Sequence, residues 1–284
     1  MTPEAATDRG LRLLVSLTRG GARLNRVVAR SQTAFKNLAE GFLTHALSGA
    51  EMSSTTVALY GVDAGAYETQ RSLSDWERDW YEAVLPPAPA RVLVTAAGKG
   101  REVAALRSMG YTVDAFEPVE SYVERCSKLA GDGLVLTADY LDFCRAVLDD
   151  GQGPAAPLAG RVFDAVILGW GSLTHVLTHD EQQRVLAASC ALSPQGPVLA
   201  SFFARGAAAA RPESRAGRLG AAAGRLVGRF RGVSAAPLQI AFFWHLGFTY
   251  AYSAEDLEGL AATVERQLEW QPEPYGHATF LPPS

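Results

Sequence analysis

Apolar residues in the middle of the chain occur in short runs, separated by longer stretches in which they recur every three or four positions. Short apolar runs between turn residues predict buried strands, and the three-to-four spacing predicts helices with one apolar face. Strands are predicted in this way at 91–95, 112–116, 134–137, 163–168 and 198–203. Helices are predicted between them at 102–108, 119–129, 141–148 and 180–192. This alternation predicts a parallel sheet with helices on both faces.

The N-terminal part of the chain is predicted to be helical. Apolar residues recur at helical spacing over 24–42, and a shorter helix is predicted over 11–18. Ser74 is followed three residues later by Glu77, the spacing of a capping box, which predicts the start of another helix. That helix ends before the proline-rich residues 86–89.

Two further segments differ from the alternating pattern. The small and polar residues 48–58 predict a loop. Residues 204–237 are rich in Ala, Gly and Arg, with seven arginines and one glutamate, and they predict either a mobile helical lid or a partly disordered insertion.

The C-terminal segment predicts a helix and then a hairpin. Ser253 is placed to cap a helix that runs to Val264, and strands are predicted at 267–270 and 277–281 around a turn at 272–274. A terminal antiparallel hairpin is not usual in a sheet that binds dinucleotides.

Composition excludes several classes of protein. Apolar residues make up 48% of the 284 positions and charged residues 20%, which is ordinary for a globular protein. The net charge of −4 argues against general affinity for nucleic acid. No apolar run has the length of a membrane span and the N-terminus lacks a secretory signal, so we expect a cytoplasmic protein without a membrane partner. The three cysteines are widely spaced and predict no metal site.

A glycine-containing turn follows the first predicted strand. Gly98 and Gly100 precede a predicted helix, and such a turn presents backbone N–H groups to a ligand. Glu117 ends the second strand, where a carboxylate can bind ribose hydroxyls, and Asp139 follows the third, within reach of an adenine amino group. Val103 stands where a dinucleotide site needs a third glycine, and the chain has no P-loop Lys-Ser/Thr pair. The pattern therefore predicts a nucleoside ligand that is neither a dinucleotide nor a triphosphate.

Four segments in this order resemble successive motifs of class I S-adenosylmethionine-dependent methyltransferases: 92–102, 113–118, 138–140 and 163–169. Residues 192–199 resemble the turn into the fifth strand of these enzymes, and residues 253–257 resemble the helix before their final hairpin. The resemblance extends over about two thirds of the chain. It departs from the family pattern at Val94, where an acid is usual, and at Ala96, where glycine is usual.

The resemblance implies a Rossmann-like α/β fold, with a seven-stranded, mostly parallel sheet and a terminal antiparallel hairpin. It implies a methyltransferase domain over 90–284, with the insertion at 204–237, preceded by a helical cap over 1–89. S-adenosylmethionine is the implied cofactor. The residues expected to bind it are Tyr67, Ala96, Gly98, Gly100, Glu117, Pro118, Asp139, Tyr140 and Gly169. Tyr60, Tyr67 and Trp76 belong to a segment that closes over the cofactor in related folds, although core packing is the alternative for these rings.

The segment after the fourth strand faces the reaction site in the resembling family, and it contains His175. We expect His175 to be the general base, because an imidazole titrates near neutral pH; packing within the loop is the alternative. His179 lies four residues later, but a predicted helix start between the two histidines argues against a metal pair. Aromatic and polar residues predict an acceptor pocket, with buried core as the alternative. The residues expected to bind the substrate are Trp170, Trp244, His245 and Tyr250.

The predicted function is therefore methyl transfer to an O, N or C atom of a small molecule, with a role in secondary metabolism. The alternative is a degenerate partner or scaffold protein that binds S-adenosylmethionine without turnover, which the departures at Val94 and Ala96 favour. An aminopropyl transferase is a third hypothesis, but the sequence lacks a paired-acid signature for a polyamine. A homodimer is one oligomeric state that the sequence allows.

Overall fold

The computed structural model describes residues 28–62, 72–205, 214–233 and 239–283. The chain divides into two compact units, each considered by itself below. The helical unit comprises Met1–Leu47 and Pro212–Ala235, and the sheet unit comprises Ser48–Arg211 and Ala236–Ser284. Residues 48–89, which the sequence groups with an N-terminal cap, belong to the sheet unit.

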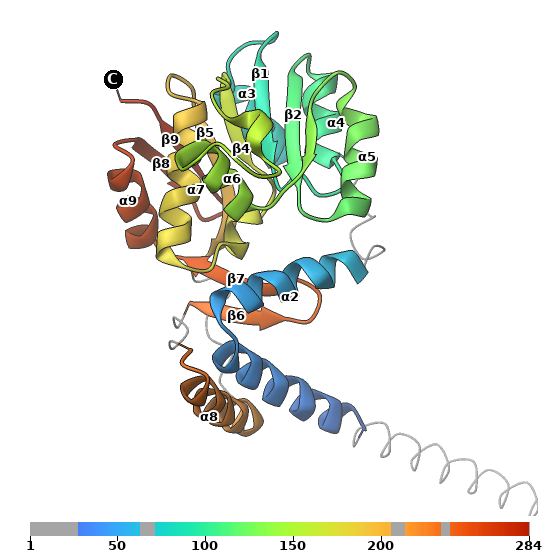
Figure 1. Ribbon diagram of the computed structural model, residues 1–284, viewed down its shortest axis with the longest axis vertical. Coiled ribbons are helices and arrows are strands. Elements are labelled where there is room, and N and C mark those ends of the chain that lie inside the picture. Colours follow the sequence, from blue (N-terminus) through green and yellow to red (C-terminus); the bar gives the residue numbers. More distant parts are fainter. Residues whose placement is uncertain (1–27, 63–71, 206–213, 234–238, 284) are drawn as a thin grey trace, which may run out of the picture. The chain divides into compact units, whose positions relative to one another are not determined.

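The sheet unit is built on one mixed sheet (Figure 1). Its parallel part consists of β1 (Arg91–Thr95), β2 (Thr112–Glu117), β3 (Val135–Thr137), β4 (Ala165–Leu168) and β5 (Val198–Ala204). Along the sheet these strands follow the order β3-β2-β1-β4-β5. The registers of β1 with β2 and with β4 bring the carboxyl ends of all three strands to one edge. The predicted strands are confirmed, and the apolar runs of β1, β2, β4 and β5 are buried on both faces, whereas β3 is partly exposed.

The terminal hairpin is confirmed as well. Strand β9 (Gly276–Leu281) pairs antiparallel with β5, and β8 (Gln267–Gln271) pairs antiparallel with β9. Helix α9 (Ala254–Thr263) precedes this hairpin, and the Ser253 hydroxyl accepts a hydrogen bond from the backbone N–H of Asp256 at its start. The α/β fold class predicted from the sequence is therefore correct.

Helices cover both faces of the sheet (Figure 1). On one face, α3 (Asp75–Val84), α4 (Arg101–Ser108) and α5 (Glu120–Ala130) pack their apolar side chains against β1, β2 and β4. On the other face lie α6 (Tyr140–Leu148) and α7 (His179–Leu192), and α7 begins with a capping box formed by Thr178 and Glu181. Two short 3₁₀ helices, η1 (Ala156–Leu158) and η2 (Ser172–His175), flank β4.

The predicted loop over residues 48–58 is wrong, because these residues begin helix α2 (Gly49–Val62). The Ser48 hydroxyl and N–H both donate to the Glu51 carboxylate, 2.8 Å away in each case, which stabilises the start of the helix. Thr56 is buried, and its hydroxyl accepts a hydrogen bond from the backbone N–H of Phe248 at 3.0 Å. Gly, Ser and Thr, which are frequent in this segment, have weak helix propensity, so the contact with the sheet stabilises a helix that the local sequence does not predict.

A second hairpin lies between β5 and α9 and was not predicted from the sequence. Strands β6 (Ile240–Phe243) and β7 (Gly247–Tyr252) pair antiparallel, and β7 pairs in parallel with the last two residues of β5. Gly247 has a φ of +77°, a conformation that suits glycine after the three-residue turn at 244–246. This hairpin brings the sheet to nine strands in the described residues, compared with the seven expected.

The helical unit contains a helix over residues 28–46 and α8 (Arg215–Phe230), and the second of these lies in the predicted insertion. Their backbones approach closely along one face of α8. A Cβ at Gly220, Gly224 or Gly228 would lie 2.0–2.4 Å from a backbone oxygen of the facing helix. The apolar stripe predicted over 24–42 is not a buried face in its described part, because Phe35 is 65% exposed.

Candidate active site

The loop between β1 and α4 turns the chain through three residues with positive φ. These are Ala96 at +46°, Gly98 at +55° and Gly100 at +83°. Gly100 has no room for a side chain, because a Cβ would lie 2.9 Å from Leu129 Cδ1. Gly98 instead has nothing within 4 Å of the position of a Cβ. The backbone at Gly98 is therefore open to a neighbouring group, as a ligand-binding turn requires.

Glu117 lies beside this loop at the end of β2. Its Oε2 accepts a hydrogen bond from the Gly98 N–H at 2.8 Å, and its Oε1 accepts one from the Val119 N–H at 3.0 Å. The side chain is buried, and burial raises the pKa of Glu117 to about 7 although both hydrogen bonds favour the ionised form. A carboxylate accepts up to four hydrogen bonds, so this group retains capacity for further donors.

Asp139 and Tyr140 follow β3, and each already has a partner within the protein. Asp139 is exposed, and its Oδ1 accepts a hydrogen bond from the Asp142 N–H at 2.8 Å as the N-cap of α6. The Tyr140 hydroxyl lies 2.9 Å from Thr95 Oγ1 and 2.6 Å from Ser172 Oγ. Tyr140 therefore joins the ends of β1 and β4, and contact of either residue with a cofactor stays a prediction.

Gly169 brings the ends of β1 and β4 together. Its N–H donates to the Thr95 carbonyl at 2.9 Å, and a Cβ would lie 2.5 Å from the same oxygen. Only glycine allows this approach. Pro118 is half-buried between β2 and α5. Tyr67, the remaining expected cofactor residue, lies outside the described residues.

Two buried carboxylates near the β1–α4 turn, Glu77 in α3 and Glu102 in α4, were missed as site residues in the sequence analysis. Glu102 accepts a hydrogen bond from the Tyr81 hydroxyl at 2.6 Å and another from the Trp170 N–H at 2.9 Å. Glu77 forms a bidentate ion pair with Arg101, with N–O distances of 2.6 and 2.8 Å. Neighbouring carboxylates and an arginine at a strand-to-helix turn were a usable signal, but Glu102 was predicted only as the first residue of a helix and Arg101 only as part of the motif at 92–102.

The two carboxyl groups differ in their pKa. Burial raises the pKa of Glu102, and this effect outweighs the nearby Arg101 and the two donors. Burial also opposes ionisation of Glu77, but hydrogen bonds from Arg101 and Ser74 lower its pKa below the ordinary value. Val94, where the resembling family has an acid, is fully buried among apolar side chains. Glu102 therefore supplies a buried carboxylate at the edge of the sheet that Val94 cannot supply.

His175 is held between two elements of the sheet unit. Its Nδ1 lies 2.9 Å from the Phe248 carbonyl and its Nε2 lies 3.0 Å from the Tyr60 hydroxyl. A carbonyl only accepts hydrogen bonds, so Nδ1 carries the proton, and the Nε2 lone pair of the neutral ring accepts a hydrogen bond from the Tyr60 hydroxyl. Burial lowers the pKa of His175, although the bond to Phe248 opposes this. The imidazole is therefore neutral at pH 7 and its Nε2 is available as a proton acceptor.

Tyr60 connects this histidine to the glycine loop. The Tyr122 hydroxyl donates to the Tyr60 carbonyl at 2.7 Å. Lys99 Nζ, in the loop itself, lies 5.3 Å from the centre of the Tyr122 ring. The predicted base and the predicted cofactor loop thus lie on the same side of the sheet unit, joined through α2 and α5.

Aromatic rings form a continuous series near the end of β4. Trp170 stacks on Tyr275 with 5.0 Å between ring centres, and Tyr275 stacks on Trp76 at 6.0 Å. Tyr275 also contacts Phe203 edge to face at 5.8 Å. Trp170 is 40% exposed, so the series ends at the protein surface. Tyr275 was not predicted as a site residue, because the segment between the last two strands was predicted only to form a turn.

The other expected substrate residues lie on the β6–β7 hairpin. His245 contacts Phe243, which contacts Phe203 and so connects His245 to the same series of rings. Trp244 is 38% exposed in the turn. Tyr250 is buried instead, and its hydroxyl donates to the Asp256 carboxylate at 3.2 Å. Contact of Trp244, His245 or Tyr250 with a substrate stays a prediction.

Metal ligands are not grouped in the described part of the chain, which contains no set of three His, Cys, Asp or Glu side chains placed to hold an ion. His179 begins α7, and its Nε2 lies 3.0 Å from Gln183 Nε2.

Comparison with known proteins shows that this chain is similar in fold to solved structures. No protein-family model matches the sequence, and no curated protein matches it. The sugar N-methyltransferase KedS8 from Streptoalloteichus sp. is similar in structure, with a TM-score of 0.52 and 17% identity over 80% of this chain and 92% of that one.

Two further solved structures are similar to a comparable degree. The 1,6-didemethyltoxoflavin-N1-methyltransferase from Burkholderia thailandensis, with bound 1,6-didemethyltoxoflavin and S-adenosylhomocysteine, has a TM-score of 0.51 and 18% identity over 83% of this chain and 88% of that one. CalS10 from Micromonospora echinaspora, an amino pentose methyltransferase with bound S-adenosylmethionine, has a TM-score of 0.50 and 13% identity over 72% of this chain and 88% of that one. At these identities the shared property is the fold.

Proposed function

We propose that this chain, which has the fold of class I S-adenosylmethionine-dependent methyltransferases, binds S-adenosylmethionine and transfers its methyl group to a small molecule. The observation that supports this most strongly is the hydrogen bond of 2.8 Å from the Gly98 N–H to the buried Glu117 carboxylate. The loop and the acid that the sequence pattern assigns to a nucleoside meet there, at the carboxyl edge of a parallel sheet where such ligands bind.

The cofactor would be held by residues around this edge. Glu117 would accept ribose hydroxyls, and Asp139 would accept the adenine amino group. Tyr67, Ala96, Gly100, Pro118, Tyr140 and Gly169 are proposed as further contacts. Bound S-adenosylmethionine supplies a methyl group activated by the positive charge on its sulfur.

His175 is proposed as the general base of the transfer. It would take a proton from the acceptor oxygen or nitrogen onto the lone pair of Nε2, and bound S-adenosylmethionine would supply the methyl group that the acceptor gains. Tyr60, whose hydroxyl lies 3.0 Å from Nε2, would relay this proton or move aside for the acceptor. A base is typically worth ~100- to 10,000-fold in rate.

The acceptor is proposed to be a small ring-containing metabolite. The half-exposed Trp170 ring, stacked on Tyr275, offers an apolar surface on which a flat or cyclic acceptor would pack. The similar structures include enzymes for sugars and for a heterocycle, and one is involved in calicheamicin biosynthesis. A role in secondary metabolism follows from this proposal, with Trp244, His245 and Tyr250 as further candidate contacts.

Calorimetry with S-adenosylhomocysteine tests cofactor binding. We expect one saturable site, with affinity lowered about tenfold or more by Glu117→Gln, because the neutral amide is a weaker acceptor for ribose hydroxyls. Glu124→Gln, on the exposed surface of α5, is the matched control and leaves the affinity unchanged. Absence of binding to the folded wild-type protein would refute the proposal.

Product analysis separates an enzyme from a degenerate binder. The protein is incubated with S-adenosylmethionine and a panel of amino sugars, phenols and heterocyclic amines, and mass spectrometry detects a gain of one methyl group. We expect His175→Gln to lower turnover and leave S-adenosylhomocysteine affinity intact, whereas His179→Gln changes neither. Binding without product from any acceptor class would favour the scaffold hypothesis.

A further inference from the structure

Charge is distributed unevenly between the two compact units. The helical unit contains twelve of the 26 Lys and Arg residues but only four of the 30 acidic residues. Its formal net charge is therefore +8, whereas the sheet unit has a net charge of −12. The overall charge of −4, which argued against general affinity for nucleic acid, is the sum of these two opposite net charges. Such asymmetry indicates an anionic partner for the basic unit.

Helix α8 presents part of this charge on one side. Arg215, Arg218, Arg225 and Arg229 are all exposed, and their spacing brings them to one stripe of the helix. Residues 214–233 contain no acidic side chain. Positive charge on this stripe is therefore not neutralised by neighbours on its own helix.

A second stripe of α8 is apolar and also exposed. Leu219, Leu226 and Phe230 follow one another at positions i, i+7 and i+11, directly beside the arginines. Their exposed fractions are 67%, 58% and 85%. The third side of α8, which carries Gly220 and Gly224, is covered by the helix over residues 28–46. The arginine and apolar stripes are thus the outward surfaces of this helix.

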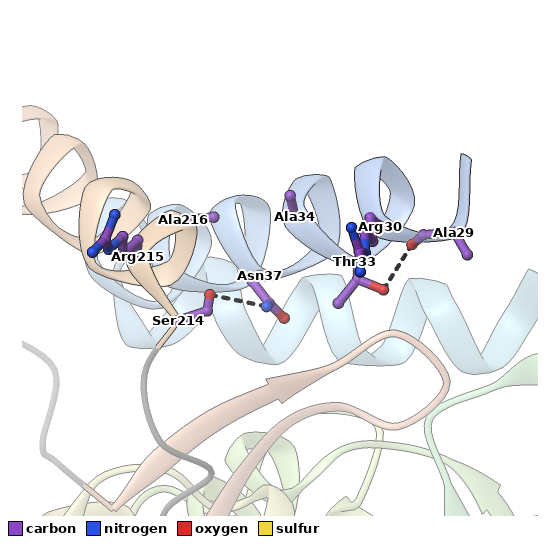
Figure 2. Close-up of a pocket in the computed structure, with 8 residues that line it drawn as sticks. All are labelled: Ala29, Arg30, Thr33, Ala34, Asn37, Ser214, Arg215 and Ala216. Atoms are coloured by element: carbon purple, nitrogen blue, oxygen red, sulfur yellow. Dashed lines mark hydrogen bonds between the residues drawn. The ribbon is translucent and has the colours of Figure 1, made fainter. Parts of the chain in front are cut away.

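The groove beside this surface lacks the side chains that a catalytic site would need. Figure 2 shows that it is lined by Ala29, Arg30, Thr33, Ala34, Asn37, Ser214, Arg215 and Ala216, with a hydrogen bond of 2.9 Å from Asn37 Nδ2 to Ser214 Oγ. It has no carboxylate, histidine or cysteine among its lining residues. Of its two arginines, Arg215 belongs to α8 itself and Arg30 adds a further positive charge beside it.

We propose that α8 docks on an anionic phospholipid surface and lies in the plane of the membrane interface. Helices that bind in this way combine Lys or Arg on one side with Leu, Phe or Trp on another. The arginines of α8 would meet lipid phosphates, and Leu219, Leu226 and Phe230 would enter the boundary between head groups and acyl chains. A nucleic acid would use only the arginines and would leave the apolar stripe unexplained. None of the helices in the described part of the chain has the length and apolar character of a membrane span.

Vesicle sedimentation with the full-length protein tests this inference. Vesicles of phosphatidylcholine alone are compared with vesicles containing 30% phosphatidylglycerol, a composition of about a third anionic lipid chosen to give a negative surface. We expect binding to the anionic vesicles only, and a decrease of at least about tenfold in partitioning when salt is raised to several hundred millimolar, since the attraction is screened.

Variants separate the two stripes. Arg225→Gln/Arg229→Gln is expected to lower partitioning about tenfold or more, and Phe230→Ser to lower it several-fold. The matched controls lie on the sheet unit: Arg78→Gln/Lys128→Gln removes two exposed charges, and Leu141→Ser removes a leucine that is 73% exposed. Controls are expected to partition as wild type, and thermal unfolding checks that every variant is folded.

Three results would overturn the proposal. The first is equal or absent binding to both vesicle compositions. The second is sedimentation without vesicles, which would show self-association through the oppositely charged units. The third is tighter retention by duplex or single-stranded nucleic acid than by anionic vesicles, with Phe230→Ser behaving as wild type. Because S-adenosylhomocysteine binding is measured separately, failure here leaves the proposed function untouched.

Discussion

Ala96 holds a backbone conformation that an alanine rarely adopts, with a φ of +46°. Left-handed backbone costs an L-residue roughly 1–2 kcal/mol, and glycine avoids this cost. The sequence analysis noted that glycine is usual here, and the geometry explains why. At Gly98 the requirement is also conformational, whereas at Gly100 a side chain would collide with Leu129. Three neighbouring positions thus favour glycine for two different reasons.

Ala96→Gly is expected to stabilise the protein by about 1 kcal/mol, since the left-handed backbone is relieved. Urea unfolding measures the change. The matched control is Ala105→Gly within α4, which is expected to destabilise by about 1 kcal/mol because glycine weakens a helix interior. An Ala96→Gly midpoint at or below that of wild type would contradict the strain argument.

Glu117 is expected to make the proposed cofactor binding dependent on pH. Its pKa of about 7 lies above the ordinary value of 4.5, because the carboxyl is buried. The stability that the neutral form contributes is therefore present below pH 4.5 and is lost as the pH rises through 7. Ribose hydroxyls favour the ionised form, so affinity changes in the opposite direction.

We therefore expect S-adenosylhomocysteine to bind roughly tenfold more weakly at pH 6 than at pH 8, in proportion to the ionised fraction. Calorimetry across this range measures the effect. In Glu117→Gln the profile is expected to be flat. A wild-type affinity independent of pH would show that Glu117 does not bind the cofactor in its ionised form.

Among the elements, α3 and α4 depend on a buried ion pair. Glu77 begins α3 through its bonds with Ser74, and the same carboxylate binds Arg101 at the start of α4. The Glu77 side chain is 1% exposed and that of Arg101 is 16% exposed. Removing one partner of such a pair leaves an unpaired charge in the interior.

Arg101→Leu is expected to lower the free energy of unfolding by about 3 kcal/mol, and Arg101→Leu/Glu77→Gln by less, because the second change removes the stranded charge. Chemical unfolding with a two-state fit gives both values. Arg145→Leu, which breaks the exposed pair with Asp150, serves as the control and is expected to have no measurable effect. Equal losses for the single and double variants would contradict the argument.

Elements differ in how far the sequence predicts them. The buried parallel strands and the helices with capping boxes were predicted to within a few residues, because local patterning and tertiary burial agree there. Helix α2 and the β6–β7 hairpin were missed, since each is stabilised by the other: the Thr56 hydroxyl binds the Phe248 N–H. A contact between residues so far apart in the chain leaves no local pattern.

At the scale of the whole molecule, the two compact units differ in net charge and in the function proposed for each. The sheet unit contains the candidate active site, and the helical unit contains the basic helix α8. A ligand that binds only the native sheet unit stabilises that unit by mass action. We therefore expect the ligand to make local opening rarer in the sheet unit and to leave local opening of the helical unit unchanged.

Hydrogen exchange tests this division. With S-adenosylhomocysteine at one hundred times its Kd, exchange over residues 95–102 and 117–122 is expected to slow by up to about a hundredfold. Exchange in α8 is expected to stay unchanged, and a peptide from the exposed loop at 150–153 serves as an internal control. Equal protection in α8 would show that the two units open together.

The sequence by itself determined the alternation of strands and helices, the terminal hairpin and the glycine turn with Glu117, because each of these depends on residues close together in the chain. The structure decided the rest: that Glu102 supplies a carboxylate which Val94 lacks, that Tyr275 stacks on Trp170, and that His175 presents Nε2 to Tyr60. The structure also shows that one compact unit is net basic and the other net acidic. These features are contacts between distant segments, and only the packing of helices against the sheet brings their side chains together.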